Sequence, residues 1–117
     1  MPSKWEIYEG PSRSLNIAAA SILRAGTLHL NPKAMELLGK DAKYVQLLYD
    51  REENRIGLRP LQRATRRARK VTKSMHTASV NLRGFLNRYE IQHEKTRRFR
   101  AARGEKGMVV IDLNKLV

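Results

Sequence analysis

The sequence contains no cysteine, and this absence excludes both disulfide bonds and thiolate metal sites. It also lacks any apolar run close to the roughly 20 residues that a membrane-spanning helix needs. The N-terminal stretch "MPSKWEIYEG" has no apolar segment of the kind found in secretory signals. These absences predict a cytoplasmic protein that has no membrane partner and is not exported.

Residue patterns typical of catalysis are also missing. The three histidines, His29, His76 and His93, are far apart and do not have the spacing of metal ligands. No glycine-rich phosphate loop occurs, and no serine lies in a glycine elbow. The carboxylates between Asp41 and Glu53 are flanked by lysine and arginine, and no second carboxylate pair converges on them. We therefore expect a protein that is not an enzyme and that uses neither a cofactor nor a metal.

Acidic residues are absent from residues 54–89, and this gap is part of a strong asymmetry of charge. The chain has 24 Lys and Arg against 11 Asp and Glu, for a net charge of +13. Residues 1–53 contain seven basic and seven acidic residues, so all of the positive excess follows Glu53. An excess on one side of the chain favours a polyanionic partner, and a nucleic acid is the usual one. The simpler alternative is a solvated basic surface without a specific partner.

The length and the hydrophobic content predict a single domain over residues 1–117. Within it, "GTLHLNPKAMELLGK" predicts a short strand, then a helix that begins after the N-cap Asn31 and ends at Gly39. The segments "YVQLLYD" and "RIGLRP", on either side of the polar "REEN", predict a pair of strands joined by a tight turn. A further short strand is expected at residues 4–10.

A similar order of elements returns later in the chain, in "HTASVNLRGFLNRYE". When Asn81 is superposed on Asn31, Val80 aligns with Leu30, and "MVVIDL" aligns with "IGLRPL" after two extra residues. We therefore interpret the chain as two pseudosymmetric β-α-β-β repeats, residues 13–61 and 76–113, joined by a basic inter-repeat segment, residues 62–75. The expected fold class is α+β, as a small β-rich domain. Two unrelated segments of the same order are the alternative.

Residues 26–60 resemble the swapped-hairpin DNA-binding domains of the AbrB/MazE/MraZ type. The matching residues are Gly26, Leu28, Leu30, Leu38, Gly39, Val45, Ile56, Leu58 and Pro60. The chain departs from that pattern at Asn31, where the family usually has proline, and at Met35, where a helix arginine is common. The second copy has Tyr89 in place of the closing glycine. The resemblance implies a swapped-hairpin-like core of two interleaved units, in a monomer or a homodimer, and it implies DNA binding.

Two basic segments are the candidate binding sites. The first, "LQRATRRARKVTK" at residues 61–73, is open between a helix, an ordered arm and a flexible linker. The second, "KTRRFRAAR" at residues 95–103, places Arg98 and Arg100 on one face if it is a strand. Guanidinium groups bind phosphates bidentately, so both segments suit a sugar-phosphate backbone. The candidate residues are Arg63, Arg66, Arg67, Arg69, Lys70, Lys73, Arg97, Arg98 and Arg100.

These patterns favour a basic nucleic-acid-binding protein that holds double-stranded DNA mainly through its phosphates, in transcription regulation or nucleoid organisation. Most of the few aromatic residues fall at periodic positions where burial is expected, which disfavours recognition by base stacking. One alternative is an RNA- or ribosome-associated structural protein, because it would show the same charge. An antitoxin-like regulator is another, although the C-terminal "MVVIDLNKLV" favours an ordered strand over a disordered toxin-binding tail.

Overall fold

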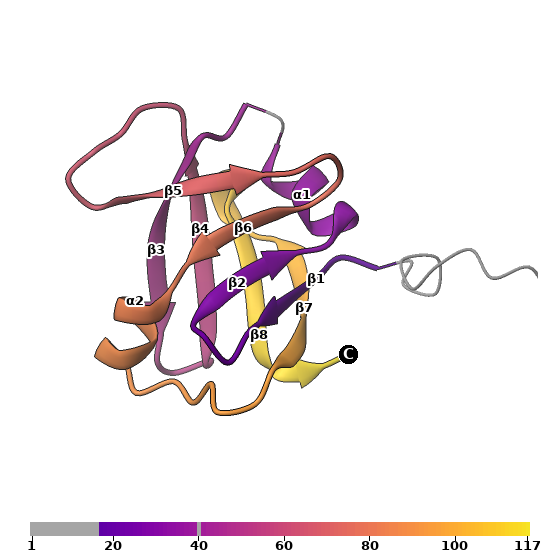
Figure 1. The fold of residues 1–117 in the computed structure, drawn as a ribbon, viewed down its shortest axis with the longest axis vertical. Coiled ribbons are helices and arrows are strands. Elements are labelled where there is room, and N and C mark those ends of the chain that lie inside the picture. The colour runs from indigo at the N-terminus through magenta and orange to yellow at the C-terminus, as the bar shows by residue number, and fades with distance from the viewer. Residues whose placement is uncertain (1–16, 40) are drawn as a thin grey trace, which may run out of the picture.

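The computed structural model describes residues 17–39 and 41–117, which form a closed β-barrel (Figure 1). The strands are β1 Ala19–Ile22, β2 Thr27–Leu30, β3 Tyr44–Asp50, β4 Arg55–Leu61, β5 Ala68–Lys73, β6 Ala78–Asn81, β7 Arg97–Arg103 and β8 Val109–Leu116. The helices are α1 Pro32–Leu38, α2 Arg83–Arg88 and the 3₁₀ turn Glu105–Gly107. The strand order is β1-β2-β6-β5-β3-β4-β8-β7, and β7 pairs with β1 to close the barrel. All of the pairs are antiparallel.

The expected α+β fold of β-α-β-β repeats in a swapped-hairpin-like domain is wrong, because the eight strands close into one barrel and the helices are too short to form a layer. Each half of the chain also begins with a hairpin, β1–β2 or β5–β6, where a single strand was expected. The sequence left the stretch of β1 open between a strand and a helix, and that of β5 open between a helix, an ordered arm and a linker. The alanine run before Ser21 is equally typical of a helix, and the basic residues of β5 are typical of a linker.

The individual elements of the first unit agree better with the sequence. The "TLHL" stretch is β2, and the next helix, α1, begins after the N-cap Asn31 and ends at Gly39, which has a φ of +100°. The basic inter-repeat segment at residues 62–75 is divided between an exposed loop, residues 62–67, strand β5 and the start of the β5–β6 turn. The strand expected at residues 4–10 lies outside the described residues.

The barrel core is built jointly by the two halves of the chain. Leu28 of β2 is paired with Val80 of β6, and Ile56 of β4 with Ile111 of β8, and all four side chains are buried. In addition, β1 pairs with β7 and β3 with β5, so each half's first hairpin is joined to the other half's second hairpin. Apolar burial is the main favourable contribution to folding, and here neither half can complete it alone.

The two helices start in different ways. Asn31 Oδ1 accepts the backbone N–H groups of Ala34 at 2.9 Å and of Ala19 at 3.1 Å, and its Nδ2 donates to the carbonyl of Ile17 at 2.9 Å. Asn31 therefore caps α1 and ties it to the start of β1. Helix α2 has no such cap, because its N-cap residue is Leu82. The expected Asn81 cap is replaced by one bond from the Arg83 N–H to Asn81 Oδ1, at 3.0 Å.

Candidate nucleic-acid interface

Five adjacent strands, β7, β1, β2, β6 and β5, make up one side of the barrel, and β5, β6, β2 and β1 lie at the front of Figure 1. None of these described strands contains Asp or Glu. We call their outer surface the carboxylate-free face. No carboxylate within these strands offsets their positive charges, and the nearest one in the register is Asp112 of β8, which lies opposite Arg100 at the β7 edge.

A row of polar side chains crosses this face from edge to edge. The register pairs Arg98 with Ser21, Ser21 with His29, His29 with Ser79, and Ser79 with Thr72. The strand neighbours of Ser21, His29 and Ser79 are buried, so these three side chains point outward. At about 4.8 Å per strand, the row extends over about 19 Å. It contains only hydrogen-bonding or basic groups.

The candidate residues predicted from the sequence lie at the two edges of this face. Arg98 and Arg100 are exposed on β7, on either side of the buried Phe99. Lys70 is exposed on β5, next to the buried Val71. Strands β5 and β7 are separated by β1, β2 and β6, so the two basic segments flank the face and do not adjoin each other.

The remaining candidates have more varied surroundings. Arg63, Arg66 and Arg67 are exposed in the loop before β5, and Arg97 is exposed at the first position of β7. Arg69 is exposed on β5, opposite the buried Val45 of β3. Lys73 is half-buried, and its Nζ donates to the carbonyl of Gly39 at 3.5 Å. Lys73 therefore contributes in part to the fold, whereas these arginines are exposed residues.

The opposite side of the barrel, strands β3, β4 and β8, carries two ion pairs, and we call it the paired face. Arg55 contacts Asp50 at 2.8 Å, and Lys115 contacts Asp112 at 3.9 Å. Among the described residues these are the ion pairs that the structure contains, and both lie on this face. Its other strand cation, Arg59, donates a hydrogen bond to Gln46 Oε1 at 3.1 Å. The side chains of Lys70, Arg98 and Arg100, in contrast, have no ion pair with any described residue.

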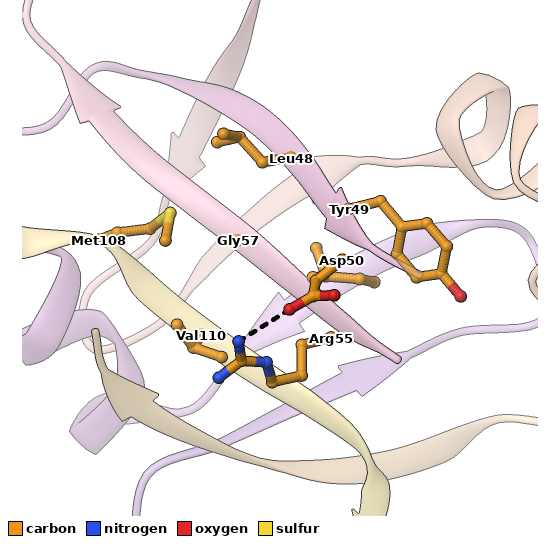
Figure 2. Close-up of a pocket in the computed structure, with 8 residues that line it drawn as sticks. Leu48, Tyr49, Asp50, Arg55, Gly57, Met108 and Val110 are labelled. Atoms are coloured by element: carbon orange, nitrogen blue, oxygen red, sulfur yellow. Dashed lines mark hydrogen bonds and ion pairs between the residues drawn. The ribbon is translucent and has the colours of Figure 1, made fainter. Parts of the chain in front are cut away.

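A hollow of about 210 Å³ on the paired face illustrates the difference (Figure 2). Asp50 and Arg55 face each other across it, while Leu48, Met108 and Val110 supply apolar walls. The hydrogen bond from Arg55, followed by one from the backbone N–H of Glu53, lowers the pKa of the Asp50 carboxyl. The same pair raises the pKa of Arg55. For an anion entering this hollow, the Arg55 guanidinium is already bound by the Asp50 carboxylate.

Sequence reasoning missed a second group of polar residues, which includes Asn81, Arg83 and Asn87. These side chains line a hollow together with the predicted Arg69 at the point where β5, β6 and α2 meet. The available signal was the acid-free stretch at residues 54–89, which contains all four residues. It could not single out Arg83, because only the fold places α2 beside β5.

Other kinds of site find no support in the described part of the chain. No cluster of three or more His, Cys, Asp or Glu side chains lies close enough to hold a metal ion within residues 17–39 and 41–117. In the same residues, no helix has the length and apolar character needed to cross a bilayer. In the comparisons with known proteins, no family model, no curated protein and no solved structure matches this chain.

Proposed function

We propose that the protein binds double-stranded DNA through its backbone phosphates, using the carboxylate-free face, in transcription regulation or nucleoid organisation. The observation that carries this proposal is the five-strand surface without a carboxylate, bordered by the exposed Lys70 of β5 and Arg98 and Arg100 of β7, none of which forms an ion pair with a described residue. Cations that have no ion pair in the protein remain available to replace the counterions that condense on a duplex.

The hydroxyl, imidazole and amide groups between the two edges fit the same partner. Half to two-thirds of protein–DNA hydrogen bonds go to phosphate and sugar oxygens, and Ser, Thr and Asn are common donors. Ser21, Ser79 and Thr72 lie in one row between the basic edges, and successive phosphates of one DNA strand are about 3.4 Å apart along the helix axis. A row of about 19 Å can therefore contact several phosphates.

The resemblance of residues 26–60 to DNA-binding domains of the AbrB/MazE/MraZ type stays a prediction and is not used as support, because the swapped-hairpin fold that it implies differs from the closed barrel. RNA binding needs the same positive charge, so RNA and DNA are distinguished by the competition assay described below. A-form RNA presents its phosphates and 2′-hydroxyls in a different geometry, so one face rarely holds both duplexes equally well. Neither the target sequence nor a preference for particular bases follows from phosphate contacts alone.

The test is a competition assay in which a labelled DNA duplex is displaced by unlabelled duplex, single-stranded DNA or structured RNA. With roughly five phosphate contacts, the logarithm of the binding constant should fall with the logarithm of salt concentration at a slope of about −4.5. That slope corresponds to a loss of roughly five-hundredfold between 50 and 200 mM salt. A binding constant that does not change with salt, or structured RNA that competes better than duplex at every salt concentration, would contradict the proposal.

A further inference from the structure

A hollow of about 590 Å³ opens at the edge of the carboxylate-free face, where β5, β6 and α2 meet. It is lined by Arg69, Asn81, Arg83, Gly84 and Asn87. Four of these five residues have polar side chains, two of them guanidinium groups, and neither a carboxylate nor an apolar side chain is among them. The lining therefore differs from that of the hollow on the paired face, which is walled mainly by apolar groups around an ion pair.

The donors around this hollow have few partners of their own. The side chains of Arg69, Arg83 and Asn87 make no hydrogen bond or ion pair with any described residue. Asn81 Oδ1 accepts the backbone N–H of Arg83 at 3.0 Å, which leaves the Nδ2 amino group of Asn81 as a donor. Two guanidinium groups and two carboxamides thus offer N–H donors around one space. A phosphate group, which has only acceptor oxygens and a negative charge, matches that set.

The backbone that carries Arg83 is held by the first half of the chain. The Leu82 N–H donates to the carbonyl of Gly26 at 2.8 Å, in the turn between β1 and β2. Gly26 has a φ of +93°, and a Cβ at this position would lie 2.9 Å from Arg83 Cβ. Leu86 anchors α2 in the core, with 0% of its surface exposed. The backbone at Arg83 is therefore already fixed before a ligand binds, so less conformational entropy is lost on binding.

Gly84 has no evident structural role in α2. It does not have a positive φ, and a Cβ built on it would have no neighbour within 4 Å. Glycine inside a helix is less favourable than alanine, so helix propensity alone would favour a residue with a side chain at this position. The missing side chain leaves room in the hollow for another molecule.

We infer that this hollow is a phosphate-binding pocket that holds one phosphate group between Arg69 and Arg83. The inference rests on the proposed function in one respect, because it assigns the phosphate to the DNA backbone. Strands β5 and β6 belong to the carboxylate-free face, so a DNA strand that crosses this face reaches the pocket at its edge. A free phosphorylated small molecule offers the same chemical group, and the experiment distinguishes the two sources.

The first measurement uses the full chain and inorganic phosphate, with pyrophosphate as a second probe, followed by NMR of the side-chain amides. We expect the Asn81 and Asn87 signals to shift and saturate in the parent protein. They should not shift in an Arg69→Gln/Arg83→Gln variant. An Arg59→Gln/Lys115→Gln variant loses the same charge on the paired face and should respond like the parent. If the Asn81 and Asn87 signals of the parent protein do not shift, the hollow does not bind phosphate and the inference is wrong.

The second measurement assigns the source of the phosphate. If Arg69 and Arg83 hold a single DNA phosphate, their joint replacement by glutamine should reduce the salt slope for duplex DNA by about 0.9, although two charges are removed. The loss of affinity at physiological salt should be about fivefold. An unchanged slope and affinity in the variant would overturn the assignment to DNA.

A third variant tests the hollow without removing charge, because the loss of two arginines could weaken binding through charge alone. Gly84→Leu adds no charge and suits a helix, but it places an apolar side chain in the lining of the hollow. We expect it to weaken phosphate and duplex binding while the melting temperature is kept or raised. If the parent binds phosphate in the pocket but no nucleic acid, the proposed function fails and the pocket serves a small phosphorylated molecule. If the parent binds duplex DNA and all pocket variants bind it equally well, only the pocket inference fails.

Discussion

The carboxylate-free face and the paired face cover the same barrel and differ in how their charges are satisfied. Beneath them, Leu28 of β2 and Leu58 of β4 are both fully buried in one core. On the outside, Arg55 is bound by Asp50 on the paired face, whereas Lys70 and Arg98 form no ion pair with any residue that the structure describes. Exposed ion pairs contribute little to stability, so unpaired cations cost the fold little. The difference teaches that the cations of the carboxylate-free face add little to stability, and the proposed function assigns them to an outside partner.

The largest expected effect tests whether the two faces share their core. Leu28→Ala and Leu58→Ala each remove a fully buried side chain, one behind each face. We expect each change to lower the free energy of unfolding by about 3 to 4 kcal/mol, the loss typical of a leucine that leaves a cavity. Urea denaturation of both variants measures it. If one variant loses far more than the other, the faces do not rest on a common core.

The next prediction compares the outer surfaces directly. A variant with Lys70, Arg98 and Arg100 changed to alanine removes three cations from the carboxylate-free face. The control variant removes three from the paired side, at Arg51, Arg59 and Lys115. If each lost cation is one phosphate contact, the first variant should lose about 2.7 units of salt slope and roughly a hundredfold in duplex affinity.

The control variant should retain most of its affinity, because its cations lie on the opposite strands or in the β3–β4 turn. A salt titration of duplex binding measures both variants. Equal losses in the two would mean that total charge matters and that the face does not. Both proteins should fold, since all six side chains are exposed.

Two asparagines near the ends of β2 and β6 separate structural from binding roles. Asn31→Ala removes the acceptor for Ala34 and Ala19 and the donor to Ile17, and Ala19 is buried. We expect a loss of about 2 kcal/mol in the free energy of unfolding.

Asn81→Ala removes one exposed hydrogen bond and should change stability by less than about 0.5 kcal/mol. Thermal melting of both variants tests the contrast. Similar melting temperatures would show that Asn31 does not anchor β1 and α1 as the geometry indicates. Because Asn81 lines the phosphate pocket, its variant should instead lose phosphate binding.

The smallest expected effect is a pH dependence that belongs to the paired face. Because the pKa of Asp50 is lowered in the folded protein, its pairing with Arg55 stabilises the fold above the carboxyl's ordinary pKa of about 4. This contribution is lost as the pH falls through the lowered pKa. Asp50→Asn should therefore be slightly less stable than the parent at pH 7 and equally stable in acid.

The measurement is urea unfolding of parent and variant at several pH values. A stability difference between the two proteins that does not change with pH would contradict the assignment. Lys70→Ala, on the carboxylate-free face, serves as the comparison, because that side chain has no ion pair to lose among the described residues. It should produce no pH dependence over the same range.

Local patterns made part of this structure predictable. Helix α1 follows from the cap at Asn31, the proline at the first helical position and the glycine at the end, all within nine residues of one another. Strands β3 and β4 follow from apolar runs around a polar turn. The cations of β5 and β7 were recognisable as candidates from charge density alone, and their role in binding stays a prediction.

Strand partnership and closure were not predictable in the same way. The pairs β1–β7 and β3–β5 join segments that are distant in the chain, and nothing near Ala19 or Ala68 specifies its partner. The basic strand β5 was open between helix, arm and linker, because its exposed residues follow no strong period. Its identity as a strand depends on pairing with β3 and β6.

The sequence by itself determined the short capped helix, the central hairpin and the excess of positive charge after Glu53, because these depend on neighbouring residues and on composition. The tertiary structure alone decided that the strands close into a barrel, that the cations of β5 and β7 flank one carboxylate-free face, and that Arg69 and Arg83 line one hollow. The physical reason is that apolar burial in a barrel is shared by the whole chain. The pairing that completes this burial also selects which charges become neighbours.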